Sequence, residues 1–82
     1  MKIAFLKYKN DKTEFEFAKK MGFKILEAED LDKVDEYIEK LVNSKYKTIF
    51  ISNEVASFSE KIIKKYQFSK EIKILIAPSN RN

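Results

Sequence analysis

Cysteine and histidine are absent from this 82-residue chain, and each absence excludes a class of chemistry. Without cysteine there can be no disulfide, no thiolate nucleophile and no cysteine-ligated metal. Without histidine the chain lacks the commonest general base and the commonest metal ligand of proteins. No apolar run approaches the roughly 20 residues of a membrane span, and the N-terminus lacks the apolar core of a signal peptide. We therefore expect a cytoplasmic protein.

Glycine, proline and arginine each occur only once, as Gly22, Pro78 and Arg81. The net charge of +4, from 17 basic and 13 acidic residues, therefore comes almost entirely from lysine. Nucleic-acid-binding proteins favour arginine for bidentate contacts and gather their basic residues on one face. Here the lysines alternate with glutamate and aspartate along the chain, which is typical of a solvated surface. We expect no nucleic-acid partner.

What the chain does contain is a regular alternation of apolar runs and amphipathic segments. Four short apolar runs predict strands, at residues 3–6, 23–26, 47–51 and 72–77. Between them, apolar residues recur at helical spacing over about 13–21, over 31–42, and from 52 or 53 to about 66 or 67. The order βαβαβαβ predicts one α/β domain spanning residues 1–82, with a parallel sheet and crossover helices.

Local signals mark several ends of these segments. Thr13 and Glu16 have the spacing of a capping box, and Gly22 suits the left-handed position that follows a helix. Ser52 or Asn53 can cap the third helix. Pro78 ends the last strand, because proline cannot donate a hydrogen bond to a sheet.

The composition of each run predicts the strand order. The first and third have the cleanest apolar runs, so they belong in the centre, whereas the second and fourth are interrupted by a lysine within the run and suit the edges. The predicted order is 2-1-3-4, in a three-layer, Rossmann-like (receiver-like) sandwich. Right-handed crossovers place the first helix on one face and the other two on the opposite face. The thinly covered face and the free edge of the fourth strand are then surfaces for a partner.

In such a sheet, sites lie beyond the carboxyl ends of the strands where the order reverses. Residues 7–11 and 52–54 line that crevice. Residues 7–11 contain no glycine-rich turn for phosphates, which argues against nucleotide binding. A receiver-type phosphoacceptor site could use Asp11, but Ser52 and Asn53 stand where the central aspartate would be, and there is no fifth strand. Phosphorylation of Ser52 is open, although capping is the commoner role of such a serine.

Four acidic residues near the second helix, Glu27, Glu29, Asp30 and Asp32, lack the glycine turn of a calcium loop and suit a helix N-terminus. We therefore predict no metal site, no cofactor and no catalytic residue. The residues expected to contact a protein partner lie around the crevice and at the end of the last strand: Asn10, Asp11, Ser52, Asn53, Glu54, Pro78 and Ser79.

Residues 45–56, Lys-Tyr-Lys-Thr-Ile-Phe-Ile-Ser-Asn-Glu-Val-Ala, resemble the F subunit family of the V-type and archaeal-type (A-type) ATPases. In that family an apolar strand ends in Ile-Thr-Glu before a helix start that contains alanine, and Ser52 and Ala56 match its threonine and alanine. The family's fourth strand closes on Ile-Pro-Ser, which Pro78 and Ser79 match. The start at Lys2 and the Gly-Phe pair before the second strand are also similar.

The chain departs from the family at three places. Asn53 occupies the position of the family's glutamate, and Lys7-Tyr8 replaces a Gly-Asp pair. The family continues into a C-terminal helical segment, so the chain is expected to correspond to the N-terminal domain alone. The resemblance implies a noncatalytic component of the central stalk of a rotary ATPase, which binds a coiled-coil stalk protein at the periphery of the membrane complex. It would help to couple ATP hydrolysis or synthesis to ion (proton) transport.

Two alternatives stay open. The first is a stand-alone regulatory or adaptor protein with a receiver-like fold, whose ligand would bind near Asp11 and Ser52. The second is a homo-oligomer that pairs the fourth strand across a two-fold axis.

Overall fold

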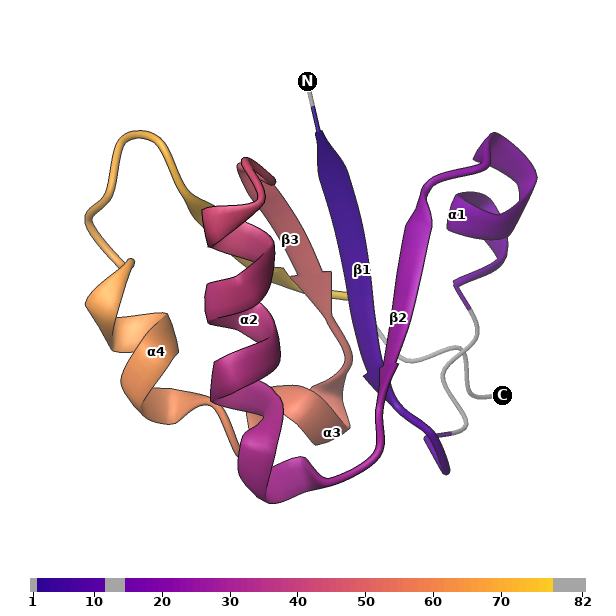
Figure 1. The fold of residues 1–82 in the computed structure, drawn as a ribbon, viewed down its shortest axis with the longest axis horizontal. Helices are drawn as coiled ribbons and strands as arrows, with labels where there is room; N and C mark the ends of the chain where they lie inside the picture. Colours follow the sequence, from indigo (N-terminus) through magenta and orange to yellow (C-terminus); the bar gives the residue numbers. More distant parts are fainter. Residues whose placement is uncertain (1, 12–14, 78–82) are drawn as a thin grey trace.

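The computed structural model describes residues 2–11 and 15–77, which form a four-stranded sheet with helices on both faces (Figure 1). Its elements in chain order are β1 (Ile3–Tyr8), α1 (Glu16–Met21), β2 (Lys24–Ala28), the 3₁₀ helix η1 (Leu31–Lys33), α2 (Val34–Asn43), β3 (Thr48–Ile51), α3 (Asn53–Ala56), α4 (Glu60–Lys65) and β4 (Lys73–Ile76). All strands are parallel and their order is β2-β1-β3-β4, so the predicted fold class and strand order are confirmed.

The two central strands are in register with both neighbours. Phe5 of β1 lies opposite Ile25 of β2 and Phe50 of β3, and Phe50 lies opposite Leu75 of β4. The strands that contain a lysine within their apolar run are the two edge strands, as predicted. An edge position leaves the lysine ammonium in water.

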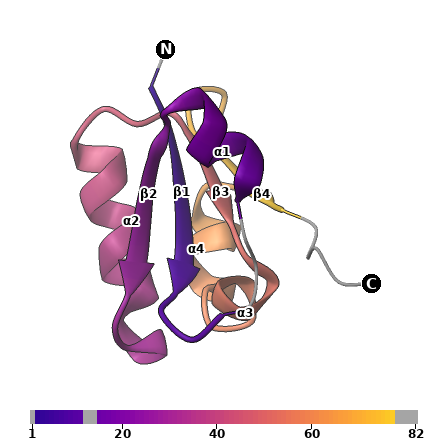
Figure 2. The same cartoon turned by 90° about the vertical axis from the view of Figure 1, so that its right-hand side faces the viewer.

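The larger core lies between the sheet and the helices α2, α3 and α4. It is built from alternate residues of the central strands and from the apolar faces of these helices: Ala4, Leu6, Ala28, Val34, Ile38, Leu41, Ile49, Ile51, Val55 and Ile62. The opposite face carries a smaller core of Phe5, Phe15 and Ala18 under α1. The Phe5 ring lies 5.0 Å from that of Phe15 and 4.8 Å from that of Phe50, between ring centroids. Figure 2 shows α1 alone on its face, as the crossover rule predicts.

Several predicted boundaries differ from the structure. The helix expected over about 13–21 begins at Glu16, its N-cap residue Phe15 makes no side-chain cap bond, and Thr13 lies outside the described residues. The strand expected over 23–26 spans Lys24–Ala28, and those expected over 47–51 and 72–77 are Thr48–Ile51 and Lys73–Ile76. Gly22 does adopt the predicted left-handed conformation, with φ 75°.

The prediction of one continuous third helix was wrong. The segment forms two short helices, α3 and α4, because serine hydroxyls satisfy carbonyl oxygens between them. Ser57 Oγ donates to the Glu54 carbonyl at 2.7 Å, and Ser59 Oγ donates to the Val55 carbonyl at 2.6 Å. The interruption rotates the apolar stripe, so Phe58, which has helical spacing with Val55 and Ile62, is 48% exposed.

Candidate functional site

At the topological switch point, the carboxyl ends of β1 and β3 lie side by side. The Ser52 N–H donates to the Leu6 carbonyl at 3.1 Å, which fixes the end of β3 against β1. The segment after β1 bends toward β2, and the segment after β3 enters α3. The two segments therefore separate beyond this bond. The polar residues that follow each strand therefore lie on the two sides of the switch point.

Ser52 serves the backbone at this point. Its side chain is fully buried, and its Oγ accepts a hydrogen bond from the Val55 N–H at 3.2 Å. This bond satisfies one of the free N–H groups at the start of α3, so the predicted helix-capping role is confirmed. A hydroxyl that is buried and engaged in this way is poorly placed to accept a phosphoryl group from solvent.

Asn53 and Glu54 lie in the first turn of α3, and both are exposed. Glu54 sits where a negative charge is favoured by the partial positive charge of a helix start. These two side chains are available to a partner, but α3 contains only four residues and presents little surface of its own.

Asn10 and Asp11 belong to the turn after β1, which is held toward β2. The Lys9 N–H donates to the Ala28 carbonyl at 3.0 Å, and the Asp11 N–H donates to the Tyr8 carbonyl at 2.9 Å. The Asn10 amide donates to the Tyr8 hydroxyl at 3.5 Å, so it packs within its own turn. Pro78 and Ser79, the other predicted contacts, lie outside the described residues.

The acidic residues before α2 have a local structural role. Asp30 caps η1, because its Oδ1 accepts from the Asp32 N–H at 3.0 Å, and the Glu29 N–H donates to the Tyr37 hydroxyl at 3.4 Å. Over residues 2–11 and 15–77, no three acidic side chains converge in a way that could hold a metal ion. In the same ranges no helix has the length and apolar character to cross a membrane.

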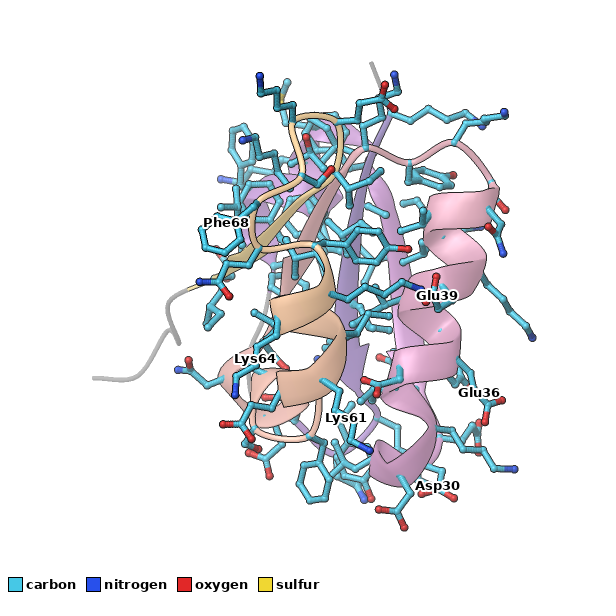
Figure 3. All side chains as sticks on the ribbon, turned by 90° about the vertical axis from the view of Figure 1, so that its left-hand side faces the viewer. Asp30, Glu36, Glu39, Lys61, Lys64 and Phe68 are labelled. Atoms are coloured by element: carbon cyan, nitrogen blue, oxygen red, sulfur yellow. The ribbon has the colours of Figure 1, made fainter. Side chains whose placement is uncertain are left out.

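A second concave surface lies between α2 and α4 (Figure 3). It encloses about 430 Å³, and its lining includes Asp35 and Glu39 from α2 and Lys61, Ile62 and Lys65 from α4. A hydrogen-bonded ion pair crosses it, because Lys65 Nζ lies 2.5 Å from Glu39 Oε2. This ion pair joins the two helices on the face of the larger core.

Glu39 also accepts a hydrogen bond from the Tyr66 hydroxyl at 2.9 Å. The bond from Lys65, and after it the bond from Tyr66, lowers the pKa of Glu39 from its ordinary value of 4.5. The bond to Glu39 raises the pKa of Lys65 above 10.5. Burial, followed by the bond to Glu39, raises the pKa of Tyr66 above 10.0. The three groups thus stabilise one another at neutral pH, which is a structural role.

The outer side of β4 is a third surface, and it is apolar. Leu75 and Ile76, which point to opposite faces of the sheet at this edge, are 44% and 53% exposed, and Phe68, in the turn after α4, is 86% exposed. Large apolar side chains that are exposed together often mark a place where another molecule binds. Sequence patterns predicted the free edge of this strand but not the exposure of Phe68. The one feature that could have indicated this exposure is that Phe68 falls outside every helical stripe.

Comparisons with protein-family models, with curated proteins and with solved structures found no match.

Proposed function

We propose that this chain is a noncatalytic component of the central stalk of a V/A-type rotary ATPase, similar to the F subunit of that family. It binds a coiled-coil stalk protein and helps to couple ATP hydrolysis or synthesis to ion transport. The proposal starts from the sequence resemblance at residues 45–56, which in the structure span the turn into β3, β3 itself and α3. The predicted strand order, now observed, is compatible with it.

One contrast in the structure carries the proposal. At the switch point, where an enzyme of this architecture would place reactive groups, Ser52 is buried and caps a helix. At the far edge of the sheet, Leu75 and Ile76 are exposed to solvent. Ser52 therefore supports the backbone, while the exposed apolar side chains that a protein partner could cover lie elsewhere. This distribution fits a binding subunit better than a catalyst.

The proposal is tested by producing the chain together with the coiled-coil stalk protein encoded in the same genome. We expect the two to elute as one complex of defined stoichiometry in size-exclusion chromatography. The control is a lysozyme-sized protein of matched net charge, which should elute separately. Separate elution of the chain and the stalk protein at micromolar concentration would contradict the proposal and favour a stand-alone adaptor.

A further inference from the structure

The outer edge of β4 presents backbone groups that can pair with another strand. The Lys73 N–H donates to the Lys47 carbonyl and the Ala77 N–H donates to the Ile51 carbonyl, both at 2.8 Å. Because successive residues of a strand alternate between its two neighbours, the N–H and C=O groups of Ile74 and Ile76 point away from β3. Among the described residues, β4 pairs with β3 alone.

A hollow lies beside this edge, on the face that carries α4. It encloses about 250 Å³, and Ile63, Tyr66, Ile72 and Ile74 are among the residues that line it. An added strand would project every second side chain toward this face of the sheet. Apolar side chains at those positions would enter the hollow, while the exposed Ile76 extends the apolar surface along the strand.

Positive charge surrounds the same edge. Between Lys64 and Ile76 the chain has four lysines and one glutamate, and one of the four, Lys65, is paired with Glu39. Figure 3 shows Lys64 and Phe68 on the side of α4 that faces away from α2. Lys73 lies opposite Thr48 in register, on the other face of the sheet from Ile74. Lysines therefore flank both faces of the free edge.

The negative charge of the protein is concentrated elsewhere. Residues 27–39, in β2, η1 and α2, contain seven acidic residues and one lysine. The charge separation makes the β4 edge a poor surface for a second copy in a symmetric pair, since Lys64, Lys70 and Lys73 of both copies would meet. It makes the same edge attractive to an acidic segment.

We propose that the β4 edge binds an extended segment of a partner protein in which acidic and apolar side chains alternate. The segment adds a fifth strand through the backbone of Ile74 and Ile76, its apolar side chains lie over the hollow, and its carboxylates lie beside Lys73. This inference rests on the proposed function only in that both require a protein partner, since the chemistry of the edge does not specify which one.

The test uses two synthetic eight-residue peptides with blocked ends, one alternating glutamate and valine and one alternating lysine and valine. Each is titrated into the 15N-labelled chain. We expect the glutamate peptide to shift the amide signals of Ile74 and Ile76 most and to slow their hydrogen exchange. We also expect it to bind at least tenfold more tightly than the lysine peptide, with an affinity that falls as salt rises.

Two pairs of variants separate the backbone contribution from the charge contribution. Ile76→Pro removes an outward N–H without touching the β3 ladder and should weaken binding at least tenfold, whereas Ile76→Val should not. Lys73→Glu should weaken binding severalfold, whereas Lys20→Glu, the same charge change on α1, should leave it unchanged. Circular dichroism spectra and thermal midpoints show whether each variant is folded. If a variant is unfolded, the titration of the wild-type chain with the two peptides still tests the inference.

Shifts centred away from β4, or equal affinity for the two peptides, would overturn the inference. So would a dimer in sedimentation that involves the β4 amides, or tighter binding of a poly-dT oligonucleotide at the same residues. The two proposals can fail separately. If the stalk complex forms but the glutamate peptide does not bind the β4 edge, the edge assignment is wrong; if the glutamate peptide binds β4 but no stalk complex forms, the proposed function is wrong.

Discussion

The end of helix α1 allows the backbone strain at a single residue to be measured. The Gly22 N–H donates to the Lys19 carbonyl at 3.3 Å, and the Phe23 N–H donates to the Ala18 carbonyl at 3.0 Å. This pair of bonds is a Schellman motif, which requires a left-handed residue, and Gly22 has φ 75°. A Cβ placed on Gly22 meets no atom within 4 Å, so a substitution there tests the backbone alone.

Helix α2 ends in the same motif with a lysine in place of the glycine. The Lys45 N–H donates to the Val42 carbonyl and the Tyr46 N–H donates to the Leu41 carbonyl, both at 3.0 Å. Lys45 also has φ 75°, and it is the only non-glycine residue with positive φ in the described part of the chain. Two substitutions should therefore change the backbone strain in opposite directions: Gly22→Ala introduces it, and Lys45→Gly removes it.

The magnitudes follow from two opposing contributions. A left-handed conformation costs a non-glycine residue about 1–2 kcal/mol. Replacing glycine by alanine also restricts the unfolded chain, which returns about 0.4–1 kcal/mol. Gly22→Ala should therefore destabilise the fold by about 1 kcal/mol, or roughly 4–8 °C in Tm for a domain of this size. Gly22→Val should destabilise the fold by more than about 1 kcal/mol, because a side chain branched at Cβ tolerates the left-handed conformation least.

Lys45→Gly should stabilise the backbone by the amount that Gly22→Ala destabilises it. It also removes a cation from a helix C-terminus, which costs about 0.3–1 kcal/mol. Lys45→Ala loses the same charge and keeps the strain, so it is the matched control. We expect Lys45→Gly to be about 1 kcal/mol more stable than Lys45→Ala. Urea denaturation of all variants, with equal m values, measures these differences. A neutral Gly22→Ala, or a Lys45→Gly less stable than Lys45→Ala, would refute the reasoning.

Three further predictions concern the cap, the core and the ion pair. Ser52→Ala should destabilise by about 1 kcal/mol in urea denaturation, because α3 loses its cap, while Ser57→Ala on the exposed side should cost less; equal costs would contradict the capping role. Ile49→Ala in the central strand should cost about 2–5 kcal/mol, whereas Leu75→Ala, which is 44% exposed, should cost roughly 0.5 kcal/mol. The lowered pKa of Glu39 contributes stability that is present above its ordinary value of 4.5 and lost as the pH falls through the folded value. Wild type should therefore lose stability below pH 4.5 more steeply than Glu39→Gln, and parallel curves would show that the ion pair contributes nothing.

The sheet could be predicted from the sequence because its signals are local. Each strand is an apolar run, and the single lysine within the second and fourth runs indicated the edges. Gly22 marked the end of α1 because only one glycine is available and it follows an apolar stripe. The strand order followed from these edges, and the handedness of the crossovers then placed the first helix on one face and the rest on the other.

The break between α3 and α4 could not be predicted from the spacing of apolar residues. Val55, Phe58 and Ile62 keep helical spacing through the interruption, and the break depends on the hydroxyls of Ser57 and Ser59 bonding to carbonyl groups. Such bonds are available to any serine in a helix, so the sequence alone does not say when they form. Lys45 was missed for a related reason, since nothing about a lysine indicates a left-handed conformation.

The candidate site was predicted unevenly. The capping role of Ser52 follows from a serine placed directly after a buried strand, and the structure confirms it. The contact of Glu39 with Lys65 and Tyr66 joins residues 26 and 27 positions apart on different helices, and it depends on how α2 and α4 pack. The exposure of Leu75 likewise depends on how far α1 covers its face of the sheet, whereas Ile76 points to the opposite face.

The central claim is that the chain acts as a component of a rotary ATPase stalk, and its most direct test is purification from native membranes. The tagged chain is recovered under mild detergent, and quantitative mass spectrometry compares the proteins recovered with those from a tag-only control. We predict that stalk and catalytic subunits of a V/A-type ATPase are enriched in fixed ratio to the chain. Recovery of the chain without any ATPase stalk protein would contradict the claim.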